Sequence, residues 1–586
     1  MYRTHNCGTL TKVDENKTVT LSGWVVNPKN HGGLIFSYLR DRYGVTQLVF
    51  DSKDKELFKI ASELKREDVI KVEGNVVKRP KEMLKEDIAT GEIEVHIKTI
   101  EILNKCGALP IEINDKVNTS DEMRLKYRYL DLRREEMQNK LLIRHKVAQA
   151  IREYLSSKLF LEIETPMLVR STPEGARDYI VPSRVHHGNA YSLPQSPQLY
   201  KQILMVSGCD RYFQLAKCMR DEDLRADRQP EFTQVDLEMS FVEQDDVLEI
   251  IDGLIKHTFE KGIGKKINVP IQRLSYEEAM LKFGTDKPDL RFGLELKDIT
   301  EEVKNSEFSV FSETVKNGGI IKVINPENEL SRKEIDELTE IAKRCGAKGL
   351  AWTKINNGLL DSGISKFLKE SEQKEILKKS GAKNGTLLFV ADNFNVTNFT
   401  LATIRNELGR KLNLIDESEF RFCWIVDYPL FEWDDEENRW SPAHHMFTMP
   451  KAEHIEHLDK DPAKVKATLY DLVLNGVELG SGSIRIHRED IQEKVMKVIG
   501  LDKKEAHNKF GFLLESFRYG APPHGGIALG FDRLVALMCG TNDIREVIAF
   551  PKNKSGQNPM DNCPSPIEDN AAKEVHIKVV KDSKNS

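Results

Sequence analysis

Two stretches that read as β-strands with a period of two constrain this chain of 586 residues more than any other feature. The first, RYFQLAKCM, covers residues 211–219, and the second, FTQVDLEMSF, covers residues 232–241. Alternation with a period of two is typical of β-strands, so we predict that they pair as an antiparallel hairpin. The long loop between them carries Arg220, Glu222 and Arg228 among many charges. Loops of this length are usually functional or disordered, so the loop is either a ligand site or a solvated, charge-rich connection.

The chain is too long for one hydrophobic core, so we expect three or four domains. Its composition, 39% hydrophobic and 31% charged residues, is that of a soluble globular protein. No apolar run approaches the ~20 residues needed to cross a bilayer, and the N-terminus lacks a signal pattern. We therefore predict a cytoplasmic protein without a membrane partner. The eight cysteines stand singly, without the paired spacing of a zinc site or a disulfide framework.

Changes in pattern along the chain predict its domains. Near the N-terminus, short alternating strands with one helical stretch after the third predict a five-stranded OB-fold barrel. Further on, Lys-rich helices alternate with short strands and predict a separate α+β module, inserted into a central domain. The expected bounds are 1–105 for the barrel, 106–138 for a hinge, 139–285 and 421–566 for the central domain, 286–420 for the insertion and 567–586 for a C-terminal tail.

A second motif, PHGGIALGFDRLVALM, places a glycine-rich strand before an apolar helix that carries Arg533 one turn inside. Glycine clusters alone more often mark tight packing. Here Gly530 and its neighbours would let a flat ligand lie on the backbone, and Arg533 would reach a terminal phosphate. At the other motif, Arg220 can bind a phosphate bidentately and Phe232 can stack on a base. Glu222 could then accept a hydrogen bond from the exocyclic amine of that base. Two such arginines suit a triphosphate.

In order and spacing, these motifs resemble those of class II aminoacyl-tRNA synthetases, and in detail the bacterial-type aspartyl-tRNA synthetase family. The matching segments are STPEGARDY, LPQSPQLYKQ, RDEDLRADRQPEFTQ, ELGSGSIRIHR and GGIALGFDRL, and the resemblance runs from residue 1 to about residue 566. It implies a six-stranded antiparallel catalytic sheet, a homodimer, and ligation of aspartate to tRNA with ATP as a substrate.

The resemblance also implies an aspartate pocket that contains both signs of charge. By this resemblance, Lys201 and Arg485 would bind the side-chain carboxylate. Asparagine in the same place would then leave the two cations facing a neutral amide and be rejected. Glu174, on a loop that can close over the substrate, would face the ammonium group. The remaining expected contacts are Gln198, Arg220, Gln234, Asp236 and His444, with His445 as an alternative to His444.

For ATP, the resemblance implies that Arg220 and Arg533 are catalytic, offsetting charge on the phosphates while the aspartate carboxylate attacks the α-phosphorus. The aspartyl-adenylate would then be attacked by the terminal ribose hydroxyl of tRNA. Asp471 and Glu478 would hold Mg²⁺, although two carboxylates on a solvent-facing stretch are the alternative. The expected ATP-binding residues are Arg220, Asp221, Glu222, Gln229, Phe232, Glu478, Gly530, Phe531, Asp532 and Arg533.

The barrel would read the tRNA anticodon through Phe36 and Gln47, with Glu94 as a further contact. His31 stands where family members selective for tRNA(Asp) usually carry Leu, so we predict that tRNA(Asn) is charged as well as tRNA(Asp). In that case a tRNA-dependent amidotransferase is expected to act on the product. The alternatives are an enzyme strictly specific for tRNA(Asp), an asparaginyl-tRNA synthetase and a non-catalytic RNA-binding paralogue.

Overall fold

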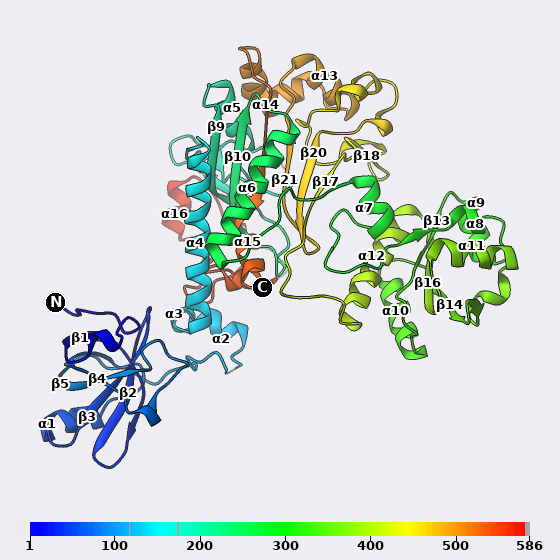
Figure 1. The fold of residues 1–586 in the computed structure, drawn as a ribbon. Coiled ribbons are helices and arrows are strands. Elements are labelled where there is room, and N and C mark those ends of the chain that lie inside the picture. Colours follow the sequence, from blue (N-terminus) through cyan, green and yellow to red (C-terminus); the bar gives the residue numbers. More distant parts are fainter. Residues whose placement is uncertain (117, 173–174, 581–586) are drawn as a thin grey trace. The chain divides into compact units, whose positions relative to one another are not determined.

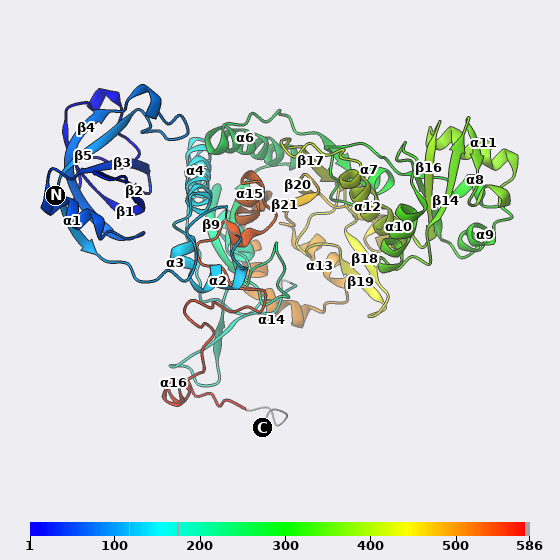
Figure 2. The same ribbon diagram turned by 90° about the horizontal axis from the view of Figure 1, so that it is seen from below.

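The computed structural model describes residues 1–116, 118–172 and 175–580. These fall into two compact units, Met1–Gln138 and Asn139–Ser586, each taken by itself below (Figures 1 and 2). Within the described ranges, every helix is too short or too polar to pass through a lipid bilayer.

The first unit contains the predicted five-stranded barrel, closed in the order β1-β2-β3-β5-β4. β3 and β5 run parallel, whereas the other neighbours are antiparallel. Alternate side chains such as Leu21 and Leu39 fill its core. Its elements are β1 (Thr18–Asn30), β2 (Leu34–Asp41), β3 (Gly44–Asp51), α1 (Lys55–Ser62), β4 (Val69–Lys78) and β5 (Ile93–Asn104).

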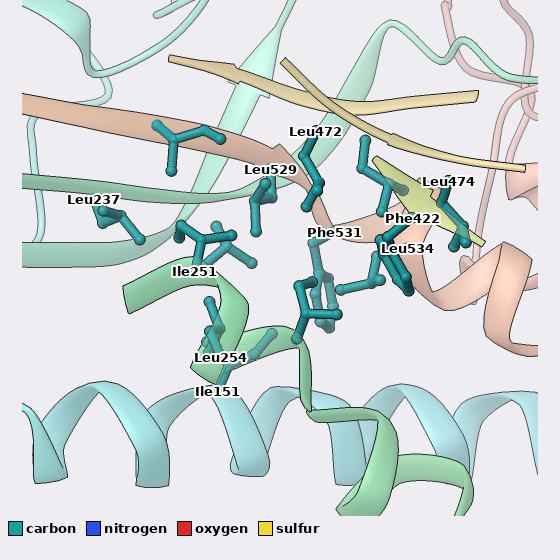
Figure 3. Packing of buried hydrophobic residues seen from close by; sticks show 14 of the residues in the cluster. Ile151, Leu237, Ile251, Leu254, Phe422, Leu472, Leu474, Leu529, Phe531 and Leu534 are labelled. Carbon is teal, nitrogen blue, oxygen red and sulfur yellow. The ribbon is translucent and has the colours of Figure 1, made fainter. Parts of the chain in front are cut away.

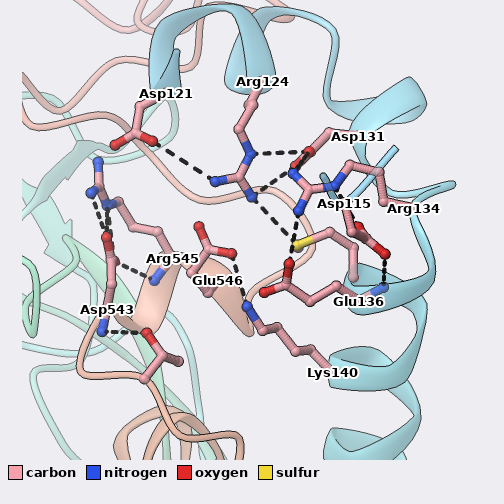
Figure 4. Close-up of polar contacts among 12 residues, drawn as sticks. Asp115, Asp121, Arg124, Asp131, Arg134, Glu136, Lys140, Asp543, Arg545 and Glu546 are labelled. Atoms are coloured by element: carbon pink, nitrogen blue, oxygen red, sulfur yellow. Dashed lines mark hydrogen bonds and ion pairs between the residues drawn. The ribbon is translucent and has the colours of Figure 1, made fainter. Parts of the chain in front are cut away.

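After the barrel, α2 (Asp121–Lys126) and α3 (Arg128–Asp131) surround one buried carboxylate. Asp131 accepts hydrogen bonds from Arg124 Nε at 3.0 Å and Arg134 Nη1 at 3.0 Å (Figure 4). It also accepts from Arg128 Nη1 at 2.6 Å. A buried charge is tolerated only when it is paired in this way. The ion pairs among these residues therefore fix how the two short helices fold onto each other.

The second unit is built on an eight-stranded sheet with the order β11-β17-β20-β21-β22-β10-β9-β6. The six inner strands are antiparallel, and β9 and β10 form the predicted hairpin. The expectation of six strands is corrected, because β6 and β11 add parallel edges that are too short to show alternation. The strands are β6 (Leu161–Glu162), β9 (Arg211–Met219), β10 (Glu231–Ser240), β11 (Arg273–Ser275), β17 (Phe422–Val426), β20 (Leu469–Leu474), β21 (Val477–Ile484) and β22 (His524–Gly530).

Helices cover one face of this sheet and form its hydrophobic core (Figure 3). They are α4 (Glu135–Ser157), α6 (Gln244–Ile263) and α15 (Phe531–Met538). Ile151, Ile251 and Leu534 from these helices meet Leu237 and Leu529 from the sheet. Because side chains alternate along a strand, the residues between these core positions point to the opposite face of the sheet.

A second sheet, with the order β12-β13-β16-β14-β15, lies between α7 (Tyr276–Phe283) and β17 in the chain. Its strands are β12 (Lys297–Asp298), β13 (Ile320–Ile324), β14 (Ala351–Asn356), β15 (Leu359–Asp361) and β16 (Gly385–Asp392). Its helices are α8 (Thr300–Val303), α9 (Ser309–Lys316), α10 (Arg332–Arg344), α11 (Glu370–Ser380) and α12 (Phe394–Lys411). We call this the inserted module, and the six expected domain bounds stay a prediction.

Shorter elements complete the chain. They are the hairpins β7 (Ile180–Pro182) with β8 (Ala190–Ser192) and β18 (Phe431–Asp434) with β19 (Arg439–Pro442), and the helices α5 (Gln198–Val206), α13 (Glu489–Val498), α14 (Lys503–Phe517) and α16 (Asp569–Glu574). Single 3₁₀ turns lie at Lys12–Asp14, Lys81–Met83, Ser365–Phe367, Ala452–His457, Pro462–Lys464 and Ile544–Glu546.

The arginine cluster around Asp131 predicts a large effect of one substitution. Asp131→Asn leaves three guanidinium groups around a neutral amide, so the free energy of local unfolding of α2 and α3 should fall by about 3–5 kcal/mol. Hydrogen exchange of the amides in both helices measures it. Asp121→Asn removes an exposed partner of Arg124 at 3.8 Å and should cost less than about 1 kcal/mol. Equal losses in the two variants would contradict the assignment.

Candidate active site

A cavity of about 790 Å³ lies on the polar face of the eight-stranded sheet. On β10, Gln234 and Asp236 line it, and Glu238 follows in the same alternation. The residues that pair with these three on β22 are Gly530, Ala528 and Gly526, all small. A Cβ on Gly526 would lie 2.4 Å from Glu238 Oε2, so that position needs glycine. The glycine-rich strand therefore makes room for side chains of its neighbour.

Two cations at one end of the cavity share the carboxylate of Glu238. Lys201 Nζ, from α5, lies 2.7 Å from Asp236 Oδ1 and 3.3 Å from Glu238 Oε2. Arg485, just after β21, places Nε 3.0 Å from Glu238 Oε1. All four side chains are buried. The structure thus brings together the two cations that the sequence assigned to one carboxylate, and it adds Glu238, which period-two alternation with Gln234 and Asp236 could have revealed.

The charges of this cluster follow from its burial. Burial would raise the pKa of Glu238, but attraction to Arg485 and Lys201 outweighs it and the pKa is lowered. Burial likewise opposes the charge of Arg485, yet the Glu238 carboxylate raises the pKa of the guanidinium. For Asp236, burial dominates and raises the pKa despite Lys201. Two cations and two carboxylates thus meet at this end of the cavity, and each buried charge has a partner of opposite sign.

The β9–β10 loop contributes a second charged wall. The Arg220 guanidinium lies 5.1 Å from the centre of the Phe232 ring, and its Nε donates to the Gln195 carbonyl at 3.3 Å. Glu222 pairs with Arg228 at 2.8 Å. All except Gln195 line the cavity, as does the predicted Gln229. The loop residues proposed to contact a nucleotide therefore lie together.

Arg533 lies near the start of α15, also in the cavity wall. Its Nη1 donates to the Glu478 carbonyl at 2.6 Å, and its Nη2 lies 3.3 Å from Asp227 Oδ2. The Glu478 carboxylate contacts Lys287 Nζ at 3.0 Å. Lys287 is a cavity residue that the sequence prediction missed, because it lies next to the insertion and far from any motif.

Three predicted nucleotide contacts stay predictions, and the structure places their side chains differently from those described above. The Phe531 side chain packs in the core, with Arg144 over its ring, so it does not reach the cavity (Figure 3). Asp532 borders the cavity but is buried and already bound by Arg144 Nη1 at 2.6 Å and by the Thr233 amide at 2.6 Å. Asp221 lies outside the cavity lining and pairs with Arg177. In α15 the helical period turns Arg533 toward the cavity and Phe531 toward the core.

The two histidines face different ends of the site. His444 Nε2 lies 3.5 Å from Asp471 Oδ2; burial opposes its charge, but the carboxylate raises its pKa. Burial, reinforced by Arg485 and Lys201, lowers the pKa of His445 to about 3 and keeps its ring neutral. His445, the alternative to His444, is thus the one near the two cations.

Asp471 is fully buried on β20, which rules out a solvent-facing position for it. Its Oδ2 accepts from the Tyr428 hydroxyl at 2.9 Å, whereas its Oδ1 has no hydrogen-bond partner. In the described part of the chain, no three His, Cys, Asp or Glu side chains form a ready metal cluster. The assignment of Asp471 and Glu478 to Mg²⁺ remains a prediction, which the unpartnered oxygen of Asp471 and the cavity position of Glu478 fit.

Gln195 forms hydrogen bonds with the loop that follows the STPEG segment. Its Oε1 accepts from the Ala176 amide at 3.2 Å, and its Nε2 donates to the Ala176 carbonyl at 2.8 Å. Gly175, with φ +97°, lines the cavity. Glu174, predicted to bind the substrate ammonium, lies outside the described residues. Gln198 lines the cavity from the start of α5, where its buried Nε2 lacks a partner.

In the first unit, the predicted anticodon residues lie in two pairs. The rings of His31 and Phe36 meet edge to face at 5.8 Å. Gln47 Nε2 donates to Glu94 Oε2 at 2.9 Å, and the other Glu94 oxygen contacts His96 Nε2 at 2.9 Å. His96, which the sequence analysis did not select, joins this group through the parallel pairing of β3 and β5.

Comparison with known families agrees with this architecture. The family described as tRNA synthetases class II (D, K and N) matches residues 120–554, and an OB-fold nucleic acid binding domain matches residues 19–103. The chain therefore belongs to the class II tRNA synthetases, which are ATP-dependent ligases.

Individual relatives cover nearly the whole chain. A protein of Caldanaerobacter subterraneus subsp. tengcongensis named Aspartate–tRNA(Asp/Asn) ligase is 52% identical over 581 residues, 98% of each chain. One of Ruminiclostridium cellulolyticum named Aspartate–tRNA ligase is 50% identical, over 99% of this chain and 98% of its own.

Solved structures show the same fold at much lower identity. The asparaginyl-tRNA synthetase of Pyrococcus horikoshii with asparaginyl-adenylate aligns with a TM-score of 0.59 and 20% identity, over 94% of this chain and 98% of that one. The aspartyl-tRNA synthetase of Entamoeba histolytica aligns with a TM-score of 0.57 and 19% identity, over 94% and 91%.

The contact of His444 with Asp471 predicts a pH-dependent contribution to stability. A histidine whose pKa is raised on folding stabilises the protein most below its unfolded value near 6.5, and this contribution disappears as pH rises through the folded value. His444→Gln should therefore destabilise the protein more at pH 5.5 than at pH 9, in urea unfolding of both proteins. His457→Gln, outside the cavity lining, is the control, and a pH-independent difference for His444→Gln would contradict the prediction.

Proposed function

We propose that this chain activates L-aspartate with ATP and transfers it to the 3′ end of tRNA. The observation that carries the proposal is that Lys201 and Arg485 converge on one buried carboxylate, Glu238, at the wall of a cavity that Arg220 and Arg533 also line. The names of the relatives, Aspartate–tRNA(Asp/Asn) ligase and Aspartate–tRNA ligase, support the same amino acid.

The charge of the pocket favours aspartate over asparagine. Lys201 and Arg485 have more N–H donors than their contacts with Asp236 and Glu238 use, so both can also donate to an incoming carboxylate. Asparagine offers a neutral amide and leaves a cation short of a partner, which a polar site can reject by ~10⁴–10⁵. An asparaginyl-tRNA synthetase therefore fits this pocket less well, although the fold alone is shared with such enzymes.

In the proposed reaction, the protein acts by positioning and by electrostatics. Arg220, beside Phe232, would stabilise negative charge that develops at the α-phosphate, and Arg533 would hold the far phosphate. Asp471 and Glu478 would hold Mg²⁺, which supplies positive charge against the phosphates when bound. His445 is kept neutral by its surroundings, and its Nδ1 accepts from the Phe447 amide at 3.3 Å, so its Nε2 would donate one hydrogen bond to the amino acid.

For tRNA, we propose that the outer face of the barrel binds the anticodon, with Phe36 as the stacking platform and Gln47 and Glu94 as polar contacts. The His31 ring, which meets the Phe36 ring edge to face, extends this surface. We propose that the enzyme charges both tRNA(Asp) and tRNA(Asn). The product on tRNA(Asn) would then be a substrate for a tRNA-dependent amidotransferase. A cytoplasmic homodimer, as expected for such an enzyme, belongs to the same proposal.

The amino-acid assignment is tested by aspartate-dependent exchange of pyrophosphate into ATP. Lys201→Met leaves Asp236 and Glu238 with one cation fewer, so exchange should fall by at least about 100-fold, given that breaking a buried pair costs about 3–5 kcal/mol. Lys217→Met, an exposed lysine on β9, should keep full exchange. Thermal unfolding separates loss of the site from loss of the fold. Exchange that persists in a folded Lys201→Met variant would overturn the assignment.

The breadth of tRNA use is tested by aspartylation of purified tRNA(Asp) and tRNA(Asn). The wild-type protein should aspartylate both tRNAs. His31→Leu should lower the rate with tRNA(Asn) by about tenfold, which is close to the smallest loss expected when one base contact is removed, and should leave the rate with tRNA(Asp) unchanged. Phe36→Leu should lower both rates. No charging of tRNA(Asn) by the wild-type protein would reject the broader specificity.

A further inference from the structure

Lys287 is a charged residue of the cavity for which the reaction proposed above has no role. Its Nζ lies 3.0 Å from Glu478 Oε2 and 3.8 Å from Asp286 Oδ2. Lys287 lines the cavity, and its side chain is 42% exposed. A cation in this position is accessible to a ligand.

The position of Lys287 places it at the end of the cavity away from the amino-acid pocket. Glu478 stands at the start of β21 and Arg485 follows its end, seven residues further along. At about 3.3 Å per residue in a strand, the two positions are roughly 20 Å apart. Arg533 donates to the Glu478 carbonyl and Lys287 contacts the Glu478 carboxylate, so these two cations lie on either side of one residue.

We propose that Lys287 is a phosphate-binding residue for the nucleotide, which acts together with Arg533. This inference rests on the proposed function, since it assigns the far end of the same cavity to the ATP phosphates. A lysine binds phosphate as a compact charge with three donors, and its contact with Glu478 uses one of them.

The Lys287–Glu478 contact is weak enough for the ammonium to leave the carboxylate and bind a phosphate. The Lys287 side chain is 42% exposed and that of Glu478 is 29% exposed. Such partly exposed ion pairs contribute only about 0–1 kcal/mol, so turning the ammonium toward a phosphate costs little. By contrast, Lys201 at the other end is 1% exposed and tied to two carboxylates. The Lys287 ammonium can thus change partners at little cost, whereas the Lys201 ammonium cannot.

The inserted module holds the segment that carries Lys287. Arg405 of α12 is buried, and its Nη2 donates to the carbonyls of Asp289 at 2.9 Å, Phe292 at 2.8 Å and Gly293 at 2.7 Å. The Phe292 ring lies 4.1 Å from its guanidinium carbon. These contacts order the chain directly after Lys287.

Contacts before and beside this segment complete its fixation. Lys322 of β13 is buried and donates from Nζ to the carbonyls of Met280 at 2.8 Å and Leu281 at 3.1 Å, which end α7. On the other side, Gly476, in the turn between β20 and β21, has φ +81° and approaches Asp289, where an added Cβ would lie 3.3 Å from its Cβ. The inserted module thus acts on the cavity by setting where Lys287 lies, and Arg405 is a positioning residue.

The test compares kinetic constants in pyrophosphate exchange by the full-length protein. Lys287→Met should raise KM for ATP about tenfold, as expected for one charge-assisted hydrogen bond, and leave KM for aspartate unchanged. Lys287→Arg should restore most of the ATP affinity. Lys304→Met, which removes an exposed lysine of the inserted module paired with Glu301 at 2.8 Å, should change neither constant. An unchanged KM for ATP, or an equal rise in both constants, would overturn the inference.

Two further arms separate the outcomes. Equilibrium binding of ATP alone should weaken in Lys287→Met by the same factor. Arg405→Met should raise KM for ATP in the same direction, and the double variant should lose less than the product of the single effects, because both act on one contact. If Arg405→Met does not fold, Gly476→Ala takes its place. Multiplicative effects would contradict the positioning role, whereas absence of aspartate-dependent exchange in the wild-type protein would refute the proposed function itself.

Discussion

The structure of the site depends on the carboxylate of Glu238, which is buried on β10 between two cations. Removing charges from water costs several kcal/mol per ion, so this cluster persists only because each member has a close partner. Gly526 opposite Glu238 leaves the room that the carboxylate needs. The same pairing holds Lys201 and Arg485 at the cavity wall, where a carboxylate would meet both cations in place.

The two faces of the eight-stranded sheet have different roles: one packs into the hydrophobic core and the other lines the cavity. Leu237 and Leu529 point into the helical layer, where α4, α6 and α15 bury them. The residues between them, such as Asp236 and Ala528, face the cavity. A one-residue slip of β10 would exchange the two sets, so the apolar face fixes the register of the polar one. The barrel of the first unit uses the same alternation, with its core inside and Phe36 and Gln47 outside.

Much of the fold could be predicted, because its longer strands alternate and its motifs are local. The hairpin of β9 and β10, the barrel and the strand before α15 all follow from patterns within about 30 residues. The edge strand β11 could not be predicted, since three residues show no period. Within the site, packing against Arg144 and the core decides that the Phe531 side of α15 faces away from the cavity, which no local pattern shows.

By itself, the sequence determined the class of protein, the two arginines Arg220 and Arg533 and the two cations expected to meet a carboxylate, because these stand in motifs with characteristic spacing. Only the tertiary structure decided that Glu238 joins Lys201 to Arg485, that Lys287 enters the cavity beside Glu478 and that Arg405 holds the segment next to it. The physical reason is distance along the chain. Contacts between residues 37 to 247 positions apart depend on strand order and on packing of the insertion, which no local pattern encodes.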